Sequence, residues 1–237
     1  MKKLKPLNLF NNKGFWPEKV AIFDGIKEVL SIGECTTPPT IHDYRHYRDQ
    51  EWRDEDDELV AYRSIDWYVY DALDEERLQV DSDRILQSFA SEPWRNDDML
   101  GDHYDLFIME EDMFRSGANG EEQADEDYLV GRAQQLTAAV VSTHRLENMR
   151  GLPYSYLKTE VMRQLCFMFG LPDMRRDDVE LEGDDRYCSN TCILRPAHKA
   201  PEDWDRLTED RIRHGALCEP CVLDLRCFFD QVADEQD

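Results

Sequence analysis

The sequence lacks the features that would direct a protein to a membrane or to nucleic acid. No apolar run reaches the roughly 18 residues that a helix needs to cross a bilayer, and the basic start 1–17 has no apolar stretch long enough for a signal peptide. Basic residues are few, because 28 Lys and Arg oppose 52 Asp and Glu, for a formal net charge of −24. Such a surface repels phosphate backbones and anionic lipids, so we expect neither nucleic acid nor membrane as a partner.

Two common catalytic motifs are also missing, since the sequence has no serine nucleophile elbow and no glycine loop of the type that cradles phosphate. What is present suits a folded protein: 237 residues with 41% hydrophobic content can bury a core. The seven cysteines are odd in number, and two of them form a CxxC pair. In a reducing compartment this favours metal over disulfides, and we expect a cytoplasmic protein.

Three segments are predicted to be strands from their β-branched and aromatic content, namely 65–70, 104–109 and 136–143. The segment 136–143 is apolar without clean alternation, which indicates a strand covered on both faces.

Helices are expected to begin near 25–30 and to cover 80–89, where Asp81 or Ser82 can cap the start. The charged segment 41–59 is interpreted as a solvated loop or helix face, and 117–127 as a loop. Strands and helices intermix, which predicts a layered α/β or α+β domain.

The strongest helix signal is the stretch Tyr156–Leu171. Its apolar residues recur at helical spacing and predict an amphipathic helix buried along one side: Leu157, Val161, Met162, Leu165, Cys166, Met168 and Phe169. Gly170 ends the pattern and Pro172 follows, which is typical of a helix C-terminus. Paired cysteines come next, at Cys188 and Cys192 and again at Cys218 and Cys221.

A strand, a short connection, a helix ending in Phe169-Gly170-Leu171 and then paired cysteines resemble the archaemetzincin family of zinc peptidases. Cys192-Ile-Leu194 and Leu217-Cys-Glu-Pro-Cys221 are similar to two further segments of that family. The resemblance is clearest over 65–226. It implies an α+β, zincin-like single domain spanning 1–237, with a twisted mixed β-sheet packed with helices and a zinc-stapled C-terminal segment.

The sequence departs from the family at the HExxH motif, which reads Arg163-Gln-Leu-Cys-Phe167 here. By the resemblance, Arg163 and Phe167 stand at the first two histidine ligands and Gln164 at the general base. Arginine stays protonated and offers no lone pair, phenylalanine has no donor atom, and glutamine cannot take a proton from bound water. The third ligand falls on Asp173 by direct count, or on Tyr187 if 175–186 is an insertion. No catalytic residues are therefore expected.

The four paired cysteines match the positions at which the family holds a second, structural zinc. Four thiolates from two short loops give the tetrahedral site that zinc prefers, so we expect one structural zinc at Cys188, Cys192, Cys218 and Cys221. His198 and His214 flank this segment and are alternative ligands. The remaining cysteines, Cys35, Cys166 and Cys227, have no partner pattern, and Cys166 is expected in the core.

One other motif offers metal donors: His42 and His46 have the i, i+4 spacing of HExxH. They lie in a charged stretch just after Pro38-Pro39, which favours solvated side chains. His144 is interpreted as a local hydrogen-bonding residue after its strand.

Three hypotheses follow from these patterns. The first is a catalytically inactive, archaemetzincin-like pseudopeptidase that binds a protein or peptide, with Arg163 receiving a carboxylate in a cleft beside the strand 139–143. The second is an active zinc metallopeptidase with other ligands, such as His42, His46 and Asp173. The third is an acidic interaction module stapled by zinc.

Overall fold

The computed structural model describes residues 4–11, 16–45, 52–53, 59–61, 65–91, 102–116, 128–147 and 153–234. The chain forms two compact units. Unit 1 comprises Met1–Leu4, Phe15–Pro39 and Arg145–Asp237, and unit 2 comprises Lys5–Gly14 and Thr40–His144. The single domain expected over 1–237 stays a prediction.

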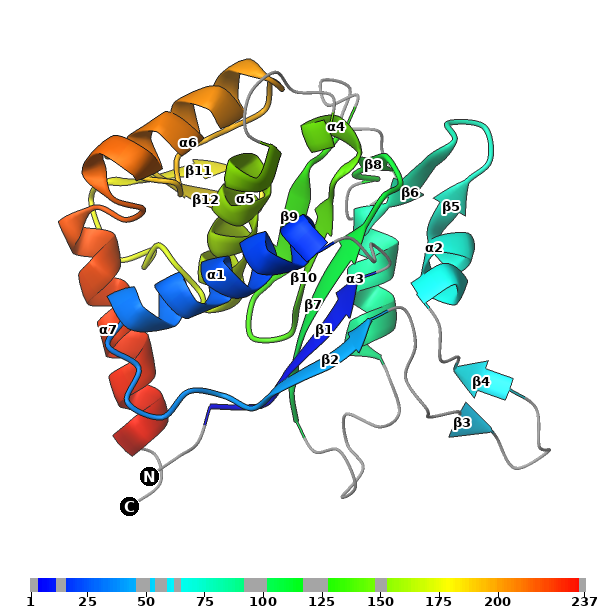
Figure 1. Cartoon of the computed structure of the whole chain (residues 1–237), viewed down its shortest axis with the longest axis horizontal. Helices are drawn as coiled ribbons and strands as arrows, with labels where there is room; N and C mark the ends of the chain where they lie inside the picture. Colours follow the sequence, from blue (N-terminus) through cyan, green and yellow to red (C-terminus); the bar gives the residue numbers. More distant parts are fainter. Residues whose placement is uncertain are drawn as a thin grey trace. The chain divides into compact units, whose positions relative to one another are not determined.

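Unit 2 contains a five-stranded mixed sheet, whose strand order is β2–β1–β7–β10–β9 (Figure 1). β1 pairs in parallel with β2 and with β7, β10 pairs in parallel with β7, and β9 is the antiparallel strand at one end. The strand bounds are Leu7–Asn11 for β1, Ile41–Arg45 for β2, Tyr104–Met109 for β7, Gly131–Gln134 for β9 and Ala138–Ser142 for β10. The mixed sheet confirms the predicted fold class.

The two strands at the centre of the prediction are confirmed. β7 and β10 are buried along their whole lengths, because each has a hydrogen-bonded neighbour on both sides and side chains packed on both faces. The smaller strands of unit 2 are β3 (Trp52–Arg53), β4 (Leu59–Ala61), β5 (Leu73–Asp74), β6 (Gln79–Asp81) and β8 (Met113–Phe114).

Helix α3 (Ser82–Ala90) begins as predicted. Asp81 is its N-cap, and the carboxylate of Asp81 accepts a hydrogen bond from the backbone N of Asp83. The helix packs its buried side, which includes Phe89, into the core of unit 2. Phe89 contacts Tyr68 in a stacked arrangement with ring centroids 4.6 Å apart, and it meets Phe107 edge-on at 5.4 Å.

The predicted strand 65–70 is wrong, because this segment lies in helix α2 (Ile65–Ala72). Its β-branched and aromatic residues favour a strand when they are considered alone. Burial follows the helical period instead: Tyr68 and Ala72 are each 2% exposed, whereas Tyr70 is 75% exposed. The stacking of Tyr68 on Phe89 stabilises the helix, and this contact outweighs the local preference of the segment for a strand.

The start of segment 41–59 is also not the predicted loop or helix face, since β2 (Ile41–Arg45) adds to the edge of the sheet. Its residues are exposed or half-buried, as their charge indicated. The acidic run 54–58 and the segment 117–127 lie outside the described residues.

Unit 1 contains the longer helices α1 (Trp16–Ile32), α5 (Pro153–Met168), α6 (Glu202–His214) and α7 (Glu219–Asp234). A hairpin of β11 (Val179–Glu182) and β12 (Asp185–Cys188) precedes α6, and the short helix α4 (His144–Glu147) begins at the last residue of unit 2. The helix expected near 25–30 is α1, which begins nine residues before Gly25. At Gly25 a Cβ would stand 3.2 Å from Val161, so glycine lets α1 approach α5 closely.

Helix α5 is the predicted helix, but it is buried more completely than one amphipathic side. The apolar stripe is inside, and so are the polar residues Thr159, Glu160, Arg163 and Gln164. Gly170 ends the helix with φ +90°, a backbone conformation that favours glycine, as predicted. Over the described ranges, no helix is long and apolar enough to cross a membrane.

Candidate metal centre

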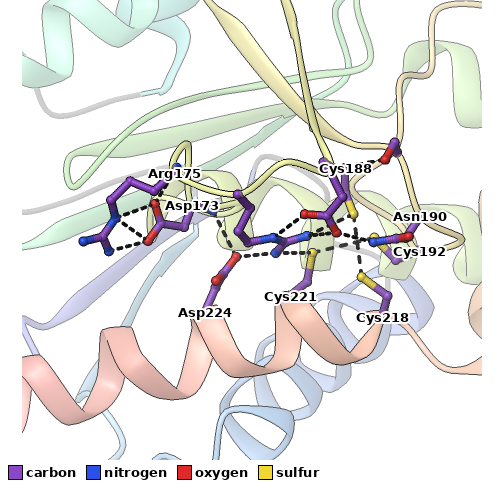
Figure 2. A network of polar contacts seen from close by, with 11 residues as sticks. Asp173, Arg175, Cys188, Asn190, Cys192, Cys218, Cys221 and Asp224 are labelled. Carbon is purple, nitrogen blue, oxygen red and sulfur yellow. Dashed lines mark hydrogen bonds and ion pairs between the residues drawn. The ribbon is translucent and has the colours of Figure 1, made fainter.

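Four cysteines from three neighbouring segments of unit 1 come together in the structure (Figure 2). Cys188 is the last residue of β12, and Cys192 lies in the loop that follows it. Cys218 immediately precedes α7, and Cys221 lies in the first turn of that helix. The backbone N of Ile193 donates to the carbonyl of Ala216 at 2.9 Å, which holds the loop that carries Cys192 against the segment that leads to Cys218.

The sulfur positions fit one tetrahedral metal ion. All four Sγ atoms lie within 4.8 Å of one another, with 3.6 Å between Cys188 and Cys218 and 4.0 Å between Cys192 and Cys221. A zinc ion with Zn–S bonds of about 2.3 Å requires sulfurs about 3.8 Å apart. The cluster therefore has the donor set and the size of a structural zinc site, as the sequence predicted.

Protonation of the cluster is shared among the four sulfurs. Hydrogen bonding to Cys192 lowers the pKa of Cys188 to about 6, and hydrogen bonding to Cys188 lowers the pKa of Cys218. The hydrogen bond with Cys188 raises the pKa of Cys192 and of Cys221. Cysteine binds a metal as the thiolate, and a divalent cation would favour that form at all four positions.

The remaining cysteines and the flanking histidines do not belong to this cluster. Cys35, Cys166 and Cys227 form no disulfide, and burial raises the pKa of Cys166 in the core to about 12. His198 Nε2 lies 2.8 Å from Glu182, and His214 is exposed at the end of α6. Among the residues that the structure describes, the four cysteines are the only group of three or more His, Cys, Asp or Glu placed to share a metal.

The face of α5 that carries the motif departures forms a second cluster. The Arg163 guanidinium lies over the ring of Phe167 at 5.1 Å and over the ring of Tyr187 at 5.7 Å. The rings of Phe167 and Tyr187 meet edge-on with centroids 5.9 Å apart. Contact with the two rings stabilises the buried cation. Among these three side chains, the only oxygen that could bind a metal is the Tyr187 phenol.

Arg163 is 3% exposed, so its charge has to be compensated inside the protein. Its Nη2 donates to the carbonyl of Arg195 at 3.0 Å, and its Nη1 lies 3.8 Å from Glu160. Glu160 also accepts hydrogen bonds from Gln164 Nε2 at 2.6 Å and from Trp204 Nε1 at 2.9 Å. Gln164 stands at the general-base position of the resembled motif, and its amide nitrogen forms the buried hydrogen bond to Glu160.

The structure separates the two candidates for the third ligand position. Tyr187 contacts both Arg163 and Phe167, whereas Asp173 is held by Arg175. Both carboxylate oxygens of Asp173 accept from Arg175, at 2.5 to 3.0 Å. That hydrogen bonding lowers the pKa of Asp173 to about 2. Tyr187 is therefore the residue that stands beside the other two altered positions.

The other described histidines of the sequence analysis, His42 and His144, belong to unit 2. His42 lies on the edge strand β2 in unit 2, where it stacks on Tyr44 at 6.0 Å. Its side chain is exposed, as the sequence favoured, and the strand does not give it the helical i, i+4 geometry. His46 lies outside the described residues. His144 begins α4, and its backbone N donates to Ser142 at 3.3 Å.

Sequence reasoning missed Glu160, Trp204 and Arg176. Glu160 lies three and four residues before Arg163 and Gln164, so helical spacing alone could have placed all three on one turn. Arg176 donates to two of the cluster sulfurs, and no sequence signal distinguishes it from its neighbour Arg175.

Together, the mixed sheet, the buried α5 and the C-terminal cysteine cluster define a zincin-like α+β protein with a four-cysteine metal site. No family model matches the sequence, and no curated protein matches it significantly. The structure is similar to the crystal structure of archaemetzincin from Methanopyrus kandleri, with a TM-score of 0.58 and 18% identity over 96% of each chain. The archaemetzincin fold that the sequence predicted is confirmed, and at this identity the likeness concerns the fold.

Proposed function

We propose that this protein is a cytoplasmic pseudopeptidase with the archaemetzincin fold, which retains a structural zinc, lacks peptidase activity and acts by binding a protein or peptide. One observation carries the proposal: the residues that the resemblance assigns to the catalytic ligands contact one another, with the Arg163 guanidinium over the rings of Phe167 and Tyr187. The Arg163 guanidinium is paired with Glu160 on this face of α5 and has no lone pair to offer a metal. The amide of Gln164 has no basic oxygen with which to activate a water.

The edge of the mixed sheet offers a mode of peptide binding. β10, the strand expected beside the cleft, already pairs with β7 and β9, so its backbone groups are occupied. β9 ends the sheet on that side, and an extended peptide can add to such an edge through main-chain hydrogen bonds. We therefore place the peptide on β9. The charge of Arg163 is compensated by Glu160 inside unit 1, so we do not assign the peptide's contacts to it.

The loss of catalysis is tested with a complex peptide library and mass spectrometry. We expect the zinc-loaded protein to produce no cleavage that 1,10-phenanthroline suppresses. Chelator-sensitive cleavage by the purified protein, abolished by Asp173→Asn, would instead support the alternative of an active peptidase with other ligands.

A restoration variant provides the matched comparison. Arg163→His, Gln164→Glu, Phe167→His and Tyr187→His together return the donors of the resembled motif, and we expect this variant to bind a second zinc ion. A folded variant that still binds one zinc would show that these four positions do not surround a former metal site.

The binding role is tested by selecting peptides from a random library on the immobilised protein. We expect peptides that bind in an extended conformation through their main chains, so that N-methylation of their backbone amides lowers the affinity. Basic peptides that dissociate at high salt, and whose affinity N-methylation leaves unchanged, would favour the acidic interaction module instead.

A further inference from the structure

Arg176 reaches the cysteine cluster from the segment between α5 and β11. Its Nη1 donates to Cys221 Sγ at 3.4 Å, and its Nη2 donates to Cys188 Sγ at 3.5 Å. One guanidinium therefore bridges a cysteine of α7 and a cysteine of β12, which belong to the two separate pairs. Nitrogen–sulfur distances of this size suit hydrogen bonds from a cation to thiolates.

Two carboxylates fix the orientation of that guanidinium. Asp178 accepts from Nε and Nη2 of Arg176 at 2.7 Å each, which is a bidentate pair. Asp224, on α7, accepts from Nη1 at 2.5 Å. Asn190 in turn donates to Asp178, from the loop between Cys188 and Cys192, and the backbone N of Asp173 donates to Asp224 at 3.0 Å. Figure 2 shows Asp224, Asn190 and the four cysteines gathered in this network.

The negative charge of the cysteine cluster requires compensation, and Arg176 is placed to supply it. Four thiolates around one divalent ion carry a net charge of two minus, and here they lie in a chain of formal charge −24. The Arg176 side chain is 15% exposed, so its interaction with the sulfurs is screened less than that of a surface residue. A lysine would bring the charge but could not reach two sulfurs and two carboxylates with one planar group.

We propose that Arg176 is a positioning residue of the zinc site: it compensates the charge of the thiolates and fixes Cys188 and Cys221 at the separation that the ion requires. Asp178 and Asp224 orient Arg176 from outside. The inference shares with the proposed function the zinc at the four cysteines, and it does not depend on the loss of peptidase activity.

The test compares Arg176→Ala with Arg175→Ala, which removes the same charge one residue away. Arg175 is a suitable control because its side chain is 85% exposed and pairs with Asp173. Zinc affinity and the rate of zinc transfer to an excess of a chromogenic chelator are measured on the full-length protein. Loss of an outer partner of a metal ligand typically weakens metal binding about 10- to 100-fold, and we expect Arg176→Ala to fall in that range while Arg175→Ala stays at the wild-type value.

Cobalt substitution supplies a readout that separates positioning from a general loss of folding. The thiolate-to-cobalt absorption reports on the four-sulfur geometry, and we expect it to shift in Arg176→Ala and to be partly restored in Arg176→Lys. If Arg176→Ala does not fold, Asp224→Asn takes its place, since asparagine can still accept from the backbone of Asp173 while holding Arg176 less firmly.

Equal zinc retention and equal cobalt spectra in the Arg176 and Arg175 variants would overturn the proposal. A wild-type protein that binds no zinc would overturn it as well, but would leave the inactivity of the α5 face untouched. Chelator-sensitive peptidase activity with normal Arg176 effects would overturn the proposed function and leave this inference standing.

Discussion

Arg163 is the single residue whose chemistry differs most from that of a metal ligand, and its surroundings are built for a cation. Glu160 is fully buried and faces it at 3.8 Å. Arg163→Met leaves this carboxylate without its cation, and breaking a buried pair costs about 3 kcal/mol. We expect the free energy of unfolding, measured in urea, to fall by about that amount.

The double variant Arg163→Met/Glu160→Gln is the control for this pair. Glutamine still accepts the Trp204 hydrogen bond, so the double variant should be more stable than the single one. A single variant as stable as the wild type would mean that the pair is not formed in solution.

At this same scale, the sequence predicted the metal site better than its surroundings. Four cysteines at short spacing have few chemical roles, so Cys188, Cys192, Cys218 and Cys221 could be assigned together. Arg176 could not, because which of two adjacent arginines turns inward depends on the placement of Asp178 and Asp224. The choice between Asp173 and Tyr187 likewise required the fold.

At the scale of elements, the end of α5 depends on Gly170 with its φ of +90°. A side chain in the left-handed region costs about 1–2 kcal/mol, and we expect Gly170→Ala to lower the free energy of unfolding by that much. Gly170→Asn is the matched comparison and should cost less, because asparagine tolerates this conformation. Equal stability of Gly170→Ala and the wild type in urea denaturation would contradict this.

The pairing of α5 with α6 produces a pH dependence. The Tyr156 hydroxyl donates to Asp205 at 2.5 Å. This hydrogen bond, with burial, raises the pKa of Tyr156 to about 12. An unfolded tyrosine titrates near about 10, so the contribution to stability is complete below that pH and disappears as the pH rises to about 12.

The measurement for this pairing is an absorbance titration of tyrosinate, with Tyr156→Phe subtracted to isolate one ring. We expect the midpoint near about 12 to move toward about 10 in Asp205→Asn. A Tyr156 midpoint that Asp205→Asn leaves unchanged would rule out the hydrogen bond as its cause.

Helices and strands were predictable from the sequence where the pattern of apolar residues was clear or a capping or terminating residue marked the end of the element. Helix α5 has an apolar repeat and a glycine stop, α3 has an aspartate cap, and β10 has an unbroken apolar run. The prediction for helix α2 was wrong because Trp67, Tyr68 and Val69 favour a strand locally, whereas the packing of Tyr68 on Phe89 stabilises a helix. β1 was missed because its short apolar run Leu7–Phe10 stands in a basic segment, although the sheet buries it completely.

At the scale of the whole molecule, the protein combines an archaemetzincin fold with a cysteine cluster that joins the hairpin β11–β12 to the start of α7. The fold is similar to that of archaemetzincin, with a TM-score of 0.58, although the two sequences are only 18% identical. Catalysis needs three metal ligands and a general base, and substitutions at a few positions remove it. The shared fold therefore does not by itself assign an activity to this chain.

The most direct test of this account is the metal content per chain, measured by elemental analysis on protein purified without added zinc. We predict one zinc per chain, lost in the variant Cys218→Ser/Cys221→Ser and retained in Asp173→Asn and Tyr187→Phe. Two zinc ions per chain, with one of them lost in Asp173→Asn or Tyr187→Phe, would contradict the account and indicate a working metal site outside the cysteine cluster.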